Sequence, residues 1–162
     1  MHPETPRPVR TFFPLVVLFL GLVSTAHAQS TEEAAVRATI DQLFTGMKTG
    51  DTSLVRQVFH PTARLQTALP GKDGQPTLQT SPIDAFVQAI GRTPRTTRLD
   101  ERLLSYEIRV DDGLATAWTP YEFFVNDQFS HAGVNAFQLA KTAGGWRIIQ
   151  ICDTRRKTRA KP

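Results

Sequence analysis

The stretch FSHAGVNAFQLAKTAGGWRIIQICDTRR, residues 129–156, decides the fold of this chain. It predicts two long strands joined by a tight turn at Gly144 and Gly145, because glycine pairs mark turns between strand patterns. The second strand, residues 146–153, is mostly apolar but ends on polar side chains. An apolar strand that finishes in polar groups is typical of the wall of a lined pocket.

The sequence before this stretch predicts three helices and further strands. Apolar residues at helical spacing, with capping residues before them and Gly or Pro after them, place the helices within residues 30–50, 52–60 and 81–91. Ser30 is expected to open the first helix. Residues 63–69 can form a strand, and residues 70–74 form a loop by composition. The period then changes to two, which predicts strands over residues 99–110 and 114–125 before the final pair.

The order of these elements predicts an α+β domain. Helices that are segregated from an antiparallel meander must be wrapped by it if both are to bury their apolar faces. We therefore expect a cone-shaped, curved antiparallel sheet around three N-terminal helices, with an apolar interior and one open mouth.

The chain is expected to hold one folded domain between two terminal segments. Residues 1–28 have the pattern of a secretory signal peptide: a basic start, a short apolar run and the cleavage signal Ala26-His27-Ala28. The apolar run is short for a membrane span, so cleavage after Ala28 and a periplasmic or secreted location are expected, with no stable membrane anchor. The domain covers residues 29–154, and residues 155–162 form a basic flexible tail.

Composition excludes two kinds of protein. Residues 29–154 carry 12 Lys and Arg against 14 Asp and Glu, a net charge of −2, so the high pI comes from the ends and no nucleic acid is expected as a partner. Cys152 is the single cysteine of the chain, which excludes an internal disulfide framework.

Several segments together resemble the nuclear transport factor 2-like superfamily, which includes SnoaL-like polyketide cyclases, ketosteroid isomerases and scytalone dehydratase. Within it, the chain is similar to exported bacterial proteins labelled "putative lumazine-binding". The resemblance covers nearly all of residues 29–162. The segments that carry it are the helix Val36…Phe44…Met47, the run Asp51…Phe59-His60-Pro61, residues 129–133, and Gly145-Trp146-Arg147-Ile148-Ile149 leading into residues 153–156.

The resemblance implies two candidate catalytic residues. In the cyclases an acid near the end of the last strand takes part in proton transfer, and Asp153 matches its position. A histidine of the preceding strand region is its partner there, and His131 is the nearest match.

Each candidate also has a structural alternative. Asp153 can act as a general base whose pKa is raised at the mouth of an apolar cone, or it can form a salt bridge to Arg155, Arg156 or an arginine of a neighbouring strand. His131 can shuttle a proton or donate to a ligand, or it can cap the loop backbone beside Gly133.

The ligand-binding candidates are aromatic or uncharged polar residues of the predicted strands. The aromatic ones can line the cone or fill its core, and the polar ones can orient a ligand or tie the sheet together. The candidates are Tyr106, Trp118, Tyr121, Asn135, Phe137 and Gln150.

Together these features predict an exported domain that binds a small apolar or aromatic molecule, with acid–base chemistry of the isomerase, cyclase or dehydratase kind. The alternative is a non-catalytic binding or interaction domain. In either case the uncovered outer face of the sheet favours a homodimer. No cofactor and no metal site are expected, because the histidines are far apart and no ligand spacing surrounds them.

Overall fold

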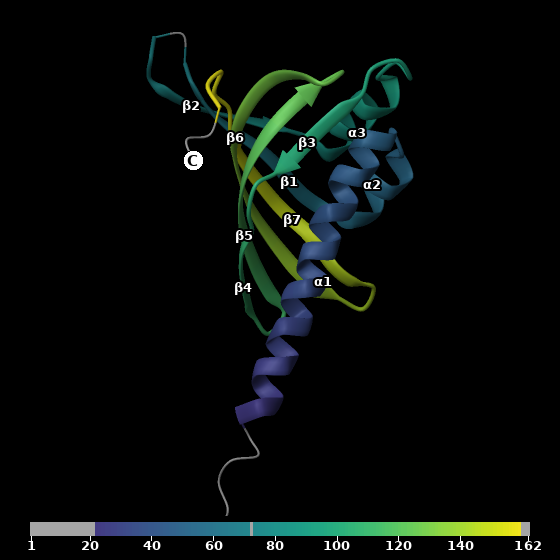
Figure 1. Ribbon diagram of the computed structural model, residues 1–162, viewed down its shortest axis with the longest axis vertical. Helices are drawn as coiled ribbons and strands as arrows, with labels where there is room; N and C mark the ends of the chain where they lie inside the picture. The colour runs from purple at the N-terminus through teal and green to yellow at the C-terminus, as the bar shows by residue number, and fades with distance from the viewer. Residues whose placement is uncertain (1–21, 72, 160–162) are drawn as a thin grey trace, which may run out of the picture.

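The computed structural model describes residues 22–71 and 73–159 of the chain, and Figure 1 shows a strongly curved sheet with the helices on one side of it. Most of the predicted signal peptide, residues 1–21, lies outside the described residues. The described elements are α1 (Leu22–Thr49), α2 (Thr52–Val58), β1 (Phe59–Pro70), β2 (Pro76–Ser81), α3 (Ile83–Arg92), β3 (Leu99–Leu103), β4 (Glu107–Asp111), β5 (Leu114–Val125), β6 (Gln128–Thr142) and β7 (Gly145–Thr154).

The seven strands form one mixed sheet in the order β2-β1-β7-β6-β5-β3, and β4 also pairs with β5. The α+β class is confirmed, but the expectation of a wholly antiparallel sheet is wrong, because β1 pairs with β7 in parallel. β1 enters the sheet from the helical segment and lies along the edge that the last strand of the meander leaves free. Its outer edge is covered by β2, a strand that was not predicted.

The predicted strand over residues 99–110 is two strands in the structure. β3 pairs with residues 121–125 of β5, and β4 pairs with residues 114–118 of the same strand. The break lies opposite Pro120, which has no N–H to donate to a neighbouring strand. Only its carbonyl oxygen is used there, as acceptor for the Leu104 N–H at 2.8 Å.

The helix boundaries agree with the sequence at one end of α1 and differ at the other. α1 ends before Gly50, whose φ of 71° suits glycine, and Asp51 then caps α2 by accepting from the Leu54 N–H at 2.9 Å. The first helix, α1, begins at Leu22 rather than at Ser30. Residues 22–28 contain neither Gly nor Pro, the residues that most disfavour a helix. Within the described residues, no helix is both long and apolar enough to cross a membrane.

Three predicted turns connect the strands as expected. Asn126 and Asp127 both have positive φ, at 50° and 62°, which is the geometry of a two-residue hairpin turn whose twist matches that of the strands. Asp112, with φ of 46°, precedes Gly113 between β4 and β5, and Gly145, with φ of 92°, opens β7.

The core lies between the concave face of the sheet and the helices. Val36, Ile40 and Leu43 of α1 are at most 1% exposed. Phe44 packs edge-on against Phe137 of β6, with ring centroids 6.2 Å apart, and Phe59 meets Phe86 of α3 in the same way. Phe44 and Phe86 also border a space that the core side chains do not fill.

Candidate functional site

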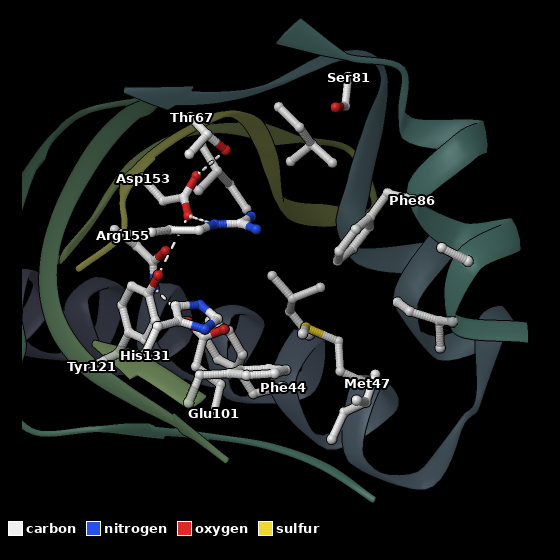
Figure 2. A pocket seen from close by; sticks show the side chains of 18 of the residues that line it. Phe44, Met47, Thr67, Ser81, Phe86, Glu101, Tyr121, His131, Asp153 and Arg155 are labelled. Atoms are coloured by element: carbon white, nitrogen blue, oxygen red, sulfur yellow. Dashed lines mark hydrogen bonds and ion pairs between the residues drawn. The ribbon is translucent and has the colours of Figure 1, made fainter. Parts of the chain in front are cut away.

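A cavity of about 320 Å³ lies inside the curved sheet, beyond the packed core. The helices supply an apolar wall to it, and Figure 2 shows their side chains facing a group of polar ones across the space. The apolar side chains of this wall are Leu43, Phe44 and Met47 of α1 and Phe86, Ala89 and Ile90 of α3. A volume of this size is typical of sites for small ligands.

Asp153 is the centre of the polar wall. It lies at the end of β7, it is 8% exposed, and the Thr67 hydroxyl of neighbouring β1 donates to its Oδ1 at 2.5 Å. Arg155 Nε donates to Oδ2 at 2.8 Å. The Tyr121 hydroxyl donates to the Thr154 carbonyl oxygen at 3.0 Å and lies 3.4 Å from Asp153 Oδ2. Both carboxylate oxygens therefore have hydrogen-bond partners, and through them Asp153 holds this wall together.

Glu101 of β3, the strand at the edge of the sheet beside β5, faces the same space. Asn135 Nδ2, opposite Asp153 in the β6–β7 ladder, donates to Glu101 Oε1 at 2.8 Å. Burial raises the pKa of Glu101 to about 7, and the charge of Asp153 adds to this, while Asn135 and Arg155 act in the opposite direction. A carboxyl group with this pKa is present in both protonation states near neutral pH, as proton transfer requires.

Two further cavity residues are held in their neutral forms. Burial, followed by the charges of Glu101 and Asp153, raises the pKa of Tyr121 well above its ordinary value, so its phenol remains a donor. Burial lowers the pKa of His131, and the positive charges of Arg155 and Lys157 lower it further. The His131 ring packs against Phe123, with centroids 4.9 Å apart, and its Nδ1 lies 3.1 Å from the Ser130 hydroxyl.

The structure brings four of the eight candidate residues to the cavity: Asp153, His131, Tyr121 and Asn135. Phe137 has the same inward orientation but lies deeper, packed against Phe44 in the core. Asp153 was expected either to line the pocket or to form a salt bridge with an arginine. In the structure it does both, because it lines the cavity and pairs with Arg155.

The other three candidates lie away from the cavity. Trp118, which is 49% exposed, and Gln150 line a separate hollow on the outer face of the sheet. Their strand positions have the opposite parity to Tyr121 and Asp153, so the side chains point outward. Tyr106 donates from its hydroxyl to Asp41 of α1 at a surface hollow between the helix and β3.

Three polar residues that the structure places around Asp153 and Asn135 were not among the predicted site residues: Glu101, Thr67 and Arg155. For Glu101 a signal was present, because it occupies the middle of the alternation Leu99, Glu101, Leu103, where an inward position carries a charge. Thr67 depends on the parallel pairing with β7, which no local pattern reveals. Among the described residues, no group of three or more His, Cys, Asp or Glu side chains is placed to hold a metal ion.

Comparison with known families identifies the chain. The family described as "Putative lumazine-binding" matches residues 31–151, three quarters of the sequence. The chain belongs to this family. Among curated proteins, none matches it significantly.

Solved structures show that this lumazine-binding family member has the nuclear transport factor 2-like fold. A nuclear transport factor 2-like protein with a cystatin-like fold from Novosphingobium aromaticivorans has a TM-score of 0.65 at 16% identity, over 91% of this chain and 95% of that one. The beta subunit of a putative aromatic-ring-hydroxylating dioxygenase from the same organism has a TM-score of 0.65 at 13% identity, over 82% and 94%. A putative dehydratase from Streptomyces avermitilis has a TM-score of 0.62 at 11% identity, over 80% and 99%.

Proposed function

We propose that this protein binds a small, largely apolar molecule in the cavity and that Glu101 exchanges a proton with it. The observation that carries the proposal is a carboxyl group of pKa about 7 facing a 320 Å³ space whose opposite wall is apolar. The family description and the dehydratase among the structural neighbours support ligand binding and acid–base chemistry as the kind of function. No step of such chemistry requires a cofactor.

The neighbours of Glu101 have distinct roles in this proposal. Asn135 orients the Glu101 carboxyl by donating from Nδ2 to Glu101 Oε1. The other oxygen of Glu101, Oε2, is then the one that meets the ligand. Asp153 keeps Tyr121 and Arg155 in place rather than acting as the base, because its oxygens already accept hydrogen bonds. His131, in its neutral form beside Phe123, supplies a polar edge and an aromatic surface to the ligand.

A thermal-shift screen of small apolar and aromatic compounds tests the binding. A compound at about 100 times its Kd stabilises the folded state by about 2.7 kcal/mol. The matched control is Ala89→Trp, which places a bulky ring at an exposed position of α3 that lines the cavity. If the stabilising compounds act equally on this variant, or if none stabilises the wild type, the cavity is not a ligand site.

Glu101→Gln tests the chemistry once a compound is found. The variant keeps the side-chain size and the acceptor for Asn135 but cannot exchange a proton. Binding should persist, while any turnover falls about 10²- to 10⁴-fold. Asp153→Asn is the comparison: if turnover depends on Asp153 alone and survives in Glu101→Gln, the assignment of the proton to Glu101 is wrong.

Export is the second part of the proposal and rests on the sequence pattern of residues 1–28. Cleavage after Ala28 would leave α1 to begin near Gln29, which keeps the buried residues Val36, Ile40 and Leu43. Mass spectrometry of the protein from an envelope fraction should show an N-terminus at Gln29. Recovery of the folded protein with Met1 in place would contradict export with cleavage.

A homodimer through the outer face of the sheet is the third part. That face has a hollow of about 380 Å³ that exposes Trp118 and is flanked by Glu107 and Arg109 of β4. These two charges are opposite, so a two-fold axis that passes between them would bring Arg109 of one copy against Glu107 of the other. Light scattering should give the mass of a dimer for the wild type and of a monomer for Trp118→Glu, and a monomeric wild type at high micromolar concentration would contradict the proposal.

A further inference from the structure

The chain that follows β7 continues the wall of the cavity. The Arg156 N–H donates to the Ala132 carbonyl oxygen at 2.8 Å, and the Ala132 N–H donates back to Arg156 at 2.9 Å. This bridge keeps the segment alongside β6 beyond the end of the strand. Because side chains alternate along extended backbone, Arg155 shares the inward face with Ile151 and Asp153, and it lines the cavity as they do.

The Arg155 guanidinium is anchored at one end and free at the other. Its Nε donates to Asp153 Oδ2, whereas its two terminal Nη groups have no acceptor among the described residues. Figure 2 shows the guanidinium beneath Asp153, directed toward the middle of the cavity. A guanidinium presents its N–H groups as a planar fork that matches a carboxylate or a similar oxyanion.

The surroundings of Arg155 favour an anion at those Nη groups. Asp153, the nearest negative charge, is already bonded by Thr67 as well as by Arg155. Glu101 also acts on Arg155, but its raised pKa keeps a share of it neutral near pH 7. Lys157 lies two residues further along the same segment. Its positive charge helps to lower the pKa of His131, which also lines the cavity. The apolar wall across the cavity then provides a surface for the remainder of the ligand.

We propose that the cavity selects a compact apolar molecule bearing one oxyanion group, a carboxylate or sulfonate, which binds to the terminal nitrogens of Arg155. The inference rests on the proposed function, since it specifies the class of ligand for the same cavity. It also gives residues 155–157 a role in binding, in place of the role of a solvated tail.

Two fluorescent probes that share one scaffold test the inference. 8-Anilinonaphthalene-1-sulfonate and N-phenyl-1-naphthylamine differ by the sulfonate group alone. A hydrogen bond to a charged group raises the affinity for a ligand by about tenfold or more. Fluorescence titration of the wild type should therefore give an affinity about tenfold or more higher for the sulfonate than for the neutral probe.

Three variants separate Arg155 from general effects of charge. Arg155→Gln should remove the preference for the sulfonate, so that the two probes bind this variant with similar affinity. Arg156→Gln, which removes the same charge one position along on the exposed, opposite face, should keep the preference. Arg155→Lys retains the charge without the fork and should give an intermediate preference.

The outcomes distinguish failure of the inference from failure of the proposed function. If the wild type binds both probes equally, or if Arg156→Gln lowers sulfonate affinity as much as Arg155→Gln, the oxyanion site is refuted while ligand binding stands. If neither probe binds, or if Ala89→Trp leaves the binding of both unchanged, the cavity is not the binding site and both proposals are wrong.

Discussion

The raised pKa of Glu101 should be measurable as a dependence of stability on pH. The carboxyl titrates at 4.5 when unperturbed and at about 7 in the folded protein, and one pKa unit corresponds to about 1.4 kcal/mol. Because the folded state holds the proton more tightly than the unfolded state, the neutral form stabilises the fold at low pH. That contribution, about 3 kcal/mol, is lost as the pH rises from about 4.5 to about 7.

The measurement is urea unfolding of the wild type and of Glu101→Gln at a series of pH values from 4 to 8. Glutamine does not titrate, so the free energy of unfolding of the wild type minus that of the variant should fall by about 3 kcal/mol across this range. The lowered pKa of His131 has the opposite sign, since it removes stability as the pH falls, but both proteins share it and it cancels in the difference. Glu107→Gln, on an exposed position outside the cavity, is the matched control.

A difference that stays constant between pH 4 and pH 8 would refute the reasoning. It would mean that water solvates Glu101 freely and that the carboxyl is ionised throughout. A second variant tests the cause: Asp153→Asn removes a charge that raises the pKa of Glu101, so the loss of stability should move to lower pH. If the transition stays in place, burial alone controls the pKa.

Three further predictions concern the frame of the site. Gly133→Ala should prevent correct folding or displace Tyr121, because a Cβ there would lie 1.9 Å from the Thr154 carbonyl oxygen and 2.8 Å from the Tyr121 hydroxyl; circular dichroism and urea unfolding check this. Phe137→Ala should cost about 3–5 kcal/mol of unfolding free energy, since the ring is 1% exposed in the core. Asp51→Ala should cost about 1 kcal/mol through loss of the α2 cap, and a smaller loss than 0.3 kcal/mol would show that the cap contributes little.

Local patterns in the sequence were sufficient for most of the fold. Helical spacing found the buried face of α1, and the residues with positive φ at the hairpin turns are Asp and Asn beside or between strand patterns. What the sequence did not reveal is non-local. The parallel pairing of β1 with β7 joins residues more than 80 positions apart, and no periodicity records which edge of the sheet a strand will take.

Two of the eight candidates, Asp153 and His131, came from the resemblance, and both line the cavity. The other six came from strand patterns, and sorting them required the register of the sheet. Trp118 and Gln150, however, were grouped with Tyr121 although they lie on the other face of the sheet. In the structure the alternation runs unbroken through Pro120, with Ala115, Ala117, Thr119 and Tyr121 buried, so Trp118 has the outward parity. The sequence could not show this, because proline is commonly found at bulges and edges where alternation is interrupted.

The position of Glu101 explains why its environment is sensitive to the rest of the fold. It lies on β3, a five-residue edge strand, and it lines both the cavity and the surface hollow between α1 and β3. The neighbouring Asp100 forms a salt bridge to Lys48 of α1, with 3.0 Å between Oδ1 and Nζ, and this holds the strand against the helix. Movement of the strand away from α1 would admit water to Glu101 and return its pKa toward 4.5, because burial is the main cause of the shift. The proton affinity of the proposed site therefore depends on a contact outside the cavity, between the first helix and the edge of the sheet.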